Sequence, residues 1–327
     1  MKPLISIIIP SYNNKIHLTR LLRSIQQNIN KYQVIKNLYE VIVVDDGSKE
    51  NIYSLKKKFK FKYFKKINGG AASARNYGTK FAKGDFLFFL DSDLEVTPNF
   101  LIQVLEIIKS KKINVLSFYY NIKSYEKNSS YATKLKAILD IYLNHKNKIF
   151  FQDQLIHGQC VIMHRNIFNK TNGWDESIEK SICEHEEYSK RILKKTKIFT
   201  NFKIGPYHYY KDFISTIREV FERSKIWSQL FYENKVVRDE RFKLMNILFK
   251  FFPLVGVFAI VIDFKIFLLF LLLFYFSHLK LYTMLVKTNN INLLLIGLFY
   301  YPLIFSTALI GSAYGTFLII YKKILFK

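Results

Sequence analysis

Two short acidic clusters carry the side chains most able to do chemistry. Asp91-Ser92-Asp93 follows an apolar run, and in an extended tip its two carboxylates lie on the same side, because side chains alternate with a period of two. Carboxylates spaced in this way suit a divalent cation that is shared with a diphosphate. Asp45-Asp46 follows a second apolar run and could accept hydrogen bonds from a ribose or a base. Each cluster would also suit a simple polar turn.

Further candidates lie in segments with helical spacing and near the end of the polar region. Arg75 could meet a phosphate or remain a solvated helix residue. Glu184 to Glu187 surrounds His185 with acids, a pattern that suits the first turn of a helix and does not exclude a catalytic role. His208 could contact a metal or a diphosphate, although a packed surface histidine is the more common case.

Alternating strands and helices are expected to bring these clusters together. Continuous apolar runs predict buried strands at Leu4 to Ile9, Val41 to Val44 and Phe86 to Leu90. Helical spacing predicts helices over Ile16 to Asn28 and Gly70 to Phe81. Strands and helices in this order imply right-handed crossovers and a parallel sheet. Ligands bind such sheets beyond the carboxyl ends of the strands, so we expect the polar clusters to converge there.

Composition excludes several classes of protein. Half of the 327 residues are hydrophobic and 17% are aromatic, which excludes a disordered chain. Cys160 and Cys183 are the only cysteines, so a disulfide scaffold is excluded. The formal net charge of +25 fits an AT-rich genome or adhesion to anionic lipid. No recognition motif supports a nucleic-acid partner, so we expect none.

The C-terminal part reads as a membrane region. Ile291 to Tyr321 carries no charged residue, which predicts a membrane-spanning helix. Leu244 to Val286 carries Asp263 and Lys265 near its middle, so a pair of helices joined there fits better than one span. That gives three spans, or a re-entrant hairpin and one span. The lysines at the C-terminal end favour an even number, so two or three helices remain open.

The chain thus divides into three expected parts. Residues 1–210 would form an α/β domain, 211–243 an amphipathic juxtamembrane connector, and 244–327 the transmembrane region. The apolar run at the N-terminus is too short for a signal peptide. We therefore expect the first domain to stay in the cytoplasm, held at the inner membrane by the C-terminal region.

Four motifs follow one another in the first hundred residues. They are Ile7-Ile8-Ile9-Pro10-Ser11-Tyr12-Asn13, Val43-Val44-Asp45-Asp46-Gly47-Ser48, Gly69-Gly70-Ala71-Ala72-Ser73-Ala74-Arg75-Asn76, and Lys83-Gly84-Asp85-Phe86-Leu87-Phe88-Phe89-Leu90-Asp91-Ser92-Asp93. Together they resemble a family 2 glycosyltransferase of the GT-A fold, over about residues 3 to 210. The resemblance implies an α/β fold with a mainly parallel sheet and flanking helices, here followed by C-terminal transmembrane helices.

The resemblance also implies roles for the matching residues. The donor would be bound by Pro10, Ser11 and Tyr12 at the nucleobase, Asp45 and Asp46 at the base or ribose, Arg75 near the base and phosphates, and Asp91 and Ser92 at the ribose or donor sugar. Asp93, with Asp91, would hold a Mg or Mn ion that bridges the diphosphate. That ion would neutralise the departing nucleoside diphosphate.

The family inverts the anomeric carbon, which requires a base for the acceptor hydroxyl. Gly158 to Arg165 resembles the strand beneath the family's acceptor site, and Gly173-Trp174-Asp175-Glu176 follows. The family usually has a Glu-Asp pair where this chain has Glu184-His185, and that aspartate is its base. Three alternatives remain: Glu184 or Glu186 takes over, His185 is itself the base, or the protein is impaired in transfer.

The expected activity is that of an inverting, metal-dependent glycosyltransferase of the hexosyl type. It would move a sugar from a nucleotide diphosphate sugar, such as a UDP-sugar, to a lipid-linked or cell-surface polysaccharide acceptor, with membrane lipid as a further partner. The alternative is a catalytically silent, membrane-anchored scaffold that binds nucleotide sugar. A sugar-1-phosphate nucleotidyltransferase would need a glycine-rich, arginine-containing loop after the first strand, which is absent.

Overall fold

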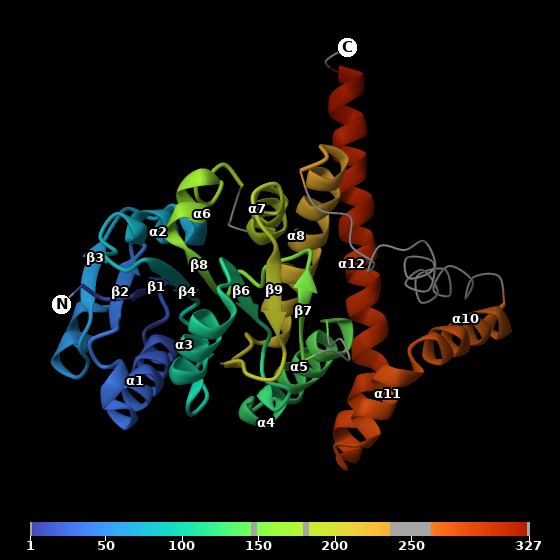
Figure 1. The fold of residues 1–327 in the computed structure, drawn as a ribbon. Coiled ribbons are helices and arrows are strands. Elements are labelled where there is room, and N and C mark those ends of the chain that lie inside the picture. Colours follow the sequence, from blue (N-terminus) through green and yellow to red (C-terminus); the bar gives the residue numbers. More distant parts are fainter. Residues whose placement is uncertain (1, 145–148, 179–182, 236–262, 326–327) are drawn as a thin grey trace. The chain divides into compact units, whose positions relative to one another are not determined.

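The computed structural model describes residues 2–144, 149–178, 183–235 and 263–325 (Figure 1). The chain forms two compact units. The first comprises residues 1–123 and 146–209, and the second comprises residues 124–145 and 210–327.

An eight-stranded mixed sheet forms the centre of the first unit, in the order β3-β2-β1-β4-β8-β6-β9-β7. Its strands are β1 (Ile5–Ser11), β2 (Tyr39–Asp45), β3 (Lys62–Lys65), β4 (Phe86–Leu90), β6 (Val115–Phe118), β7 (Phe150–Asp153), β8 (Cys160–His164) and β9 (Ile198–Asn201). The strands β3, β2, β1 and β4 are parallel, whereas β8 runs antiparallel to both β4 and β6. The three strands predicted from apolar runs are confirmed, and the antiparallel β8 makes the sheet mixed.

Helices cover both faces of this sheet (Figure 1). They are α1 (Lys15–Lys31), α2 (Gly70–Thr79), α3 (Phe100–Lys111), α6 (Arg165–Lys170) and α7 (Glu184–Leu193), with 3-10 turns at Gln33–Ile35 and Tyr53–Lys57. Ile7 and Ile9 of β1 pack with α1 and α3, whereas Ile8 packs with α2, α6 and α7. Because β1 is buried on both faces, it reads as an unbroken apolar run.

A second, two-stranded sheet lies beside the loop after β4. It pairs β5 (Leu94–Glu95) antiparallel with β10 (Tyr207–His208). The backbone N–H of Tyr209 also donates to the carbonyl oxygen of Asp93 (3.1 Å). This pairing brings the end of the first unit back to the acidic loop.

The second unit is helical. Its helices are α4 (Ser124–Lys127), α5 (Tyr131–Asn144), α8 (Phe213–Tyr232), α10 (Phe264–Ser277), α11 (Leu279–Val286) and α12 (Ile291–Leu325). Apolar residues of α5, α10, α11 and α12 form one core, including Leu135, Phe274, Leu281 and Tyr301. The packing of α5 with the C-terminal helices is a long-range grouping that the sequence did not predict.

Two glycines bring α12 close to α8. A methyl group added at Gly311 would lie 2.5 Å from the carbonyl oxygen of Phe221. One added at Gly315 would overlap the carbonyl oxygen of Lys225. Small residues four positions apart allow two helix backbones to approach closely in this way.

One described helix is long and apolar enough to cross a membrane, namely α12 over Ile291–Ile324. The pair α10 and α11 passes the same test together but is bent by 70°, so it counts as a second candidate only if it is one broken span. Asp263 caps α10 by accepting a hydrogen bond from the backbone N–H of Lys265 (2.7 Å). Residues 244–262, where the sequence predicts a further helix, lie outside the described residues. The described chain therefore holds one or two candidate spans by length and composition.

Gly78 lets α2 lie against β1, and its substitution tests this packing. A methyl group added there would lie 2.6 Å from Cγ2 of Ile8 and 3.0 Å from Cγ2 of Val44. Helix propensity favours alanine over glycine by about 1 kcal/mol, but overpacking a core costs about 1–3 kcal/mol. We expect Gly78→Ala to lower the thermal midpoint of the detergent-purified protein. Lys80→Ala, at the exposed end of the same helix, should leave it unchanged; a higher midpoint for Gly78→Ala would contradict the close approach.

Candidate active site

The loops that follow β1, β2 and β4 are joined by hydrogen bonds. The backbone N–H of Asn13 donates to Oγ of Ser48 (2.9 Å), and the Asn13 amide oxygen accepts from the N–H of Lys49 (2.8 Å). Nδ2 of Asn14 donates to Oγ of Ser92 (2.9 Å). The three loops therefore form one continuous edge at the carboxyl ends of these parallel strands, where ligands of such sheets bind.

The end of β1 offers one exposed ring and one buried hydroxyl at this edge. Pro10 and Ser11 are buried, whereas Tyr12 is 51% exposed. Oγ of Ser11 has no hydrogen-bond partner among the described residues. The Tyr12 ring is thus available to stack on a planar group.

Asp45 is buried and holds the loop after β2. Its carboxylate accepts hydrogen bonds from the backbone N–H of Ser48 (2.8 Å) and from the hydroxyl of Tyr63 (2.6 Å). Burial, together with the neighbouring Asp45 carboxylate, raises the pKa of Tyr63, so this hydroxyl stays a donor. Asp45 therefore supports the loop and does not face solvent.

Asp46 is also buried, and its carboxylate meets the start of α2. It accepts hydrogen bonds from the backbone N–H groups of Gly69 (3.1 Å) and Gly70 (2.8 Å) and from Nζ of Lys66 (2.8 Å). A carboxylate at a helix N-terminus is stabilised by the helix dipole and by unpaired N–H groups. In this arrangement a ligand that bound Asp46 would compete with one of these donors.

Arg75 is the central charge of the site. It is 1% exposed, and its guanidinium donates to Oε1 of Glu184 (2.9 Å) and to Oδ1 of Asp91 (2.7 Å). The guanidinium carbon also lies 4.7 Å from the centre of a Trp174 ring. A buried charge is costly unless it is paired, and two carboxylates and an aromatic face compensate this one. Arg75 thereby joins α2, the loop after β4 and the start of α7.

The acidic loop after β4 is anchored to the segment before β8. The backbone N–H of Asp91 donates to the carbonyl oxygen of Gln159 (2.9 Å). Burial raises the pKa of the Asp91 carboxyl; Arg75 opposes this, while the Asp93 and Glu184 carboxylates add to it. The loop thus places the Asp91 and Asp93 carboxylates close together at a partly buried position.

Asp93 lies beside a histidine from the far end of the unit. Nε2 of His208 is 3.5 Å from Oδ2 of Asp93, and the His208 ring stacks on Tyr120 with centroids 4.2 Å apart. The short strand β10 carries His208 to this contact. In the sequence, the aromatic residues around His208 indicate packing, but they do not indicate that Asp93 is its neighbour. Among the described residues, no three His, Cys, Asp or Glu side chains gather closely enough to hold a metal ion alone.

The first turn of α7 carries the remaining candidates. Glu184 is paired with Arg75, as above. Nε2 of His185 lies 3.1 Å from Oε2 of Glu186. Glu187 pairs with Arg191, whose Nε donates to its Oε1 (2.6 Å).

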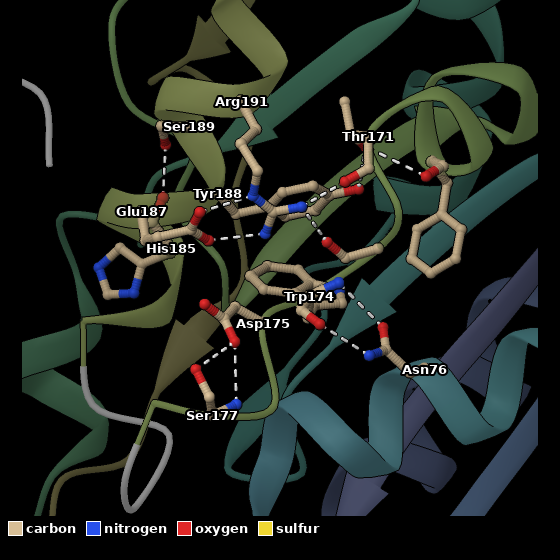
Figure 2. A network of polar contacts seen from close by, with 12 residues as sticks. Asn76, Thr171, Trp174, Asp175, Ser177, His185, Glu187, Tyr188, Ser189 and Arg191 are labelled. Atoms are coloured by element: carbon tan, nitrogen blue, oxygen red, sulfur yellow. Dashed lines mark hydrogen bonds and ion pairs between the residues drawn. The ribbon is translucent and has the colours of Figure 1, made fainter. Parts of the chain in front are cut away.

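A polar network fixes the turn that carries Trp174 (Figure 2). Arg191 donates to the carbonyl oxygens of Thr171 and Gly173. The side-chain amide of Asn76 accepts from the backbone N–H of Trp174 (2.9 Å) and donates to its carbonyl oxygen (2.8 Å). These contacts hold the Trp174 ring, which is the face on which the Arg75 guanidinium rests.

Comparison with known proteins identifies similar sequences and a similar fold. The profile described as Glycosyl transferase family 2 matches residues 6–171. An uncharacterized glycosyltransferase of Rickettsia typhi is 34% identical over 187 residues, which is 54% of this chain and 55% of that protein. The minor teichoic acid biosynthesis protein GgaB of Bacillus subtilis is 34% identical over 214 residues, which is 62% of this chain and 22% of that protein. The chain thus spans less than two thirds of these relatives.

A solved structure shares the fold at low sequence identity. It is the mannosyltransferase PcManGT from Pyrobaculum calidifontis, crystallised with GDP-Man and Mn2+, with a TM-score of 0.58 and 13% identity. The match covers 97% of this chain and 88% of that one. The expected GT-A fold is confirmed by this likeness and by the mixed, mostly parallel sheet.

Removing the Arg75 charge should be strongly destabilising. In Arg75→Gln the Asp91 and Glu184 carboxylates would face each other without a cation, and breaking a buried ion pair costs about 3–5 kcal/mol. We expect a clear drop in the thermal midpoint, and a smaller one for Arg75→Lys, because an ammonium cannot serve both carboxylates in the same way. Lys80→Gln, exposed at the C-terminal end of the same helix, is the control. An Arg75→Gln protein as stable as its parent would refute this role.

Proposed function

Because the chain belongs to glycosyl transferase family 2, we propose that it transfers a sugar from a nucleotide diphosphate sugar to an acceptor hydroxyl. The observation that carries the proposal is the single edge at which the loops after β1, β2 and β4 meet, joined through Asn13 and Asn14. That edge combines an exposed aromatic ring with a pair of carboxylates at Asp91 and Asp93. Such a set suits a ligand that is a base at one end and a metal-bound diphosphate at the other.

The donor is proposed to lie along this edge from Tyr12 to Asp93. Tyr12 would stack on the base, with Pro10 and Ser11 forming the wall beside it. Asp45 and Asp46 would support the base and ribose, partly through the ends of α2 and β2 that they hold in place. The solved mannosyltransferase binds GDP-Man, and this fold-level analogy supports a nucleotide sugar without naming it.

The residues after β4 fit a divalent metal. Asp91 and Asp93 offer carboxylate oxygens, and His208 adds an imidazole beside Asp93. A Mg ion is often held by one or two carboxylates together with substrate phosphates, so a site without a complete protein cage is consistent with this role. The ion would supply positive charge that stabilises the departing nucleoside diphosphate. Ser92, which accepts from Asn14, would fix the loop that presents these ligands.

The acceptor is proposed to be lipid-linked or part of a cell-surface polymer. The relative GgaB is named for minor teichoic acid biosynthesis, which supports a cell-surface polymer. The apolar helix α12 is a candidate membrane anchor, and an enzyme held at the bilayer suits an acceptor held there too. We propose that the first unit lies on the cytoplasmic side of the inner membrane, where nucleotide sugars are made.

The transfer is proposed to invert the anomeric carbon in one displacement. A base on the face opposite the leaving group would remove the acceptor proton. The first turn of α7, with Glu184, His185 and Glu186, would supply that base. A silent scaffold is the second candidate, because His185 stands where the family usually has an aspartate.

The test is nucleoside diphosphate release by the detergent-solubilised chain. A panel of nucleotide sugars is offered with Mn2+ and with a lipid extract of bacterial membranes or purified teichoic acid. We expect release with one donor only, dependent on metal, and reduced about 100-fold or more in Asp93→Ala, as for other lost transition-state contacts. Asp85→Ala, at the opposite end of β4 and exposed, should match the parent. Donor binding without release from any donor would favour the scaffold.

A further inference from the structure

We propose that His185 is the general base of the transfer and that Glu186 stabilises its protonated form. The inference rests on the proposed function and names the residue that carries out its proton transfer. It follows from which side chains in the first turn of α7 are already committed to other contacts.

Glu184 is committed to the buried arginine. Oε1 of Glu184 accepts from Arg75 (2.9 Å), and the Glu184 residue is 5% exposed. Protonating this carboxylate during a reaction would leave the Arg75 guanidinium with Asp91 as its only anion, in a place where unpaired charge is costly. Glu184 therefore suits a permanent counter-ion better than a group that gains and loses a proton.

Glu187 is committed as well. Both of its oxygens accept from Arg191 (2.6 Å each), and Arg191 in turn holds the carbonyl oxygen of Gly173 (2.6 Å) (Figure 2). This bidentate pair is a geometry that fixes both partners. Glu184 and Glu187, which flank His185 and Glu186, thus have structural roles.

His185 and Glu186 form a pair of their own. Nε2 of His185 is 3.1 Å from Oε2 of Glu186. A neutral imidazole keeps a lone pair on one ring nitrogen, and that nitrogen can accept a proton. A carboxylate at this distance from an imidazole stabilises the imidazolium that forms when a proton arrives.

Close packing holds His185 beside the acidic loop. A methyl group added at Gly158 would lie 2.9 Å from Cβ of His185. Gly158 is followed by Gln159, whose carbonyl oxygen accepts from the backbone N–H of Asp91. The segment 158–159 therefore bridges the histidine and the proposed metal-binding loop.

The backbone of Gly158 and the ring of Trp174 lie beside His185, since a methyl at Gly158 would meet the His185 and Trp174 side chains together. The ring of His157 packs instead against Tyr119. Glu186 is the carboxylate that lies beside the imidazole.

The proton and bond changes balance without any further reactant. The acceptor hydroxyl gives its proton to a ring nitrogen of His185, while its oxygen forms a bond to the anomeric carbon. The bond from that carbon to the diphosphate oxygen breaks, and the electron pair leaves with the nucleoside diphosphate. The imidazolium then returns its proton to water.

The experiment compares His185→Ala and His185→Asp in the full chain. Acceptor-dependent nucleoside diphosphate release is measured with Mn2+, the donor panel, and the membrane lipid extract or teichoic acid, across pH 4.5 to 9. We expect His185→Ala to lower kcat/KM about 100-fold or more with the Kd for the donor within about twofold of the parent. We expect His185→Asp to keep transfer and to move the acid limb of the profile down by about 2 pH units, from the range of histidine toward that of aspartate.

Glu186→Gln tests the supporting role by a readout that a purely structural role would not move. Loss of the carboxylate should lower kcat, though less than His185→Ala does, and should leave the KM for the donor within about twofold of the parent, because Glu186 contacts the imidazole and not the donor. His164→Ala is the matched control, because His164 pairs with Phe86 at the opposite end of β4. Its rate and pH profile should equal those of the parent.

The outcomes distinguish a wrong assignment of the base from a wrong assignment of the transferase function. Parental kcat/KM in His185→Ala, or an unchanged acid limb in His185→Asp, would overturn the assignment while leaving the transferase intact. A parent chain that binds donors and releases nothing from any of them would overturn the proposed function, and the base with it. If His185→Ala fails to fold, the profile of His185→Asp decides alone.

Discussion

The burial of one guanidinium organises the acidic edge of the first unit. Arg75 is fully enclosed, and it is neutralised by Asp91 from the loop after β4 and by Glu184 from the start of α7. Removing a cation from water is tolerable only when anions and donors meet it in good geometry. The helix α2, the acidic loop and α7 are therefore fixed relative to one another by electrostatics as well as by the apolar core beneath them. Trp174 completes the enclosure from the remaining side.

This arrangement divides the acidic residues of the edge by task. Backbone N–H groups, a tyrosine, a lysine and an arginine donate hydrogen bonds to Asp45, Asp46 and Glu184. These three carboxylates therefore hold the loops and helix ends that form the edge. Asp93 and His185 lie at more open positions, with imidazole or carboxylate neighbours that also suit proton or metal chemistry. A chain with twice as many basic as acidic residues thus gathers carboxylates at one edge. Rigid supports of this kind are what a precise reacting geometry requires.

Local patterns in the sequence were sufficient for the strands and helices that carry the acidic clusters. The run Phe86 to Leu90 was predicted with its observed bounds, because a strand buried on both faces leaves an unbroken apolar signal. Contacts between distant segments could not be predicted. No local pattern shows that Arg75 would face two carboxylates, or that a two-residue strand would bring His208 to Asp93. The packing of α5 with the C-terminal helices is hidden for the same reason, since it depends on tertiary contacts.

The bridge between Arg75 and Glu184 joins residues 109 positions apart. During synthesis, nearly all of the donor-side motifs leave the ribosome before α7 does. Before α7 is synthesised, the first half of the chain lacks Glu184. If this half packed as in the final fold, Arg75 would be buried with Asp91 as its one anion, which is energetically unfavourable. The N-terminal half should therefore mature late, as part of the whole unit and not ahead of it. Splitting the chain before residue 184 would accordingly leave a fragment that contains the motifs but lacks a stable site.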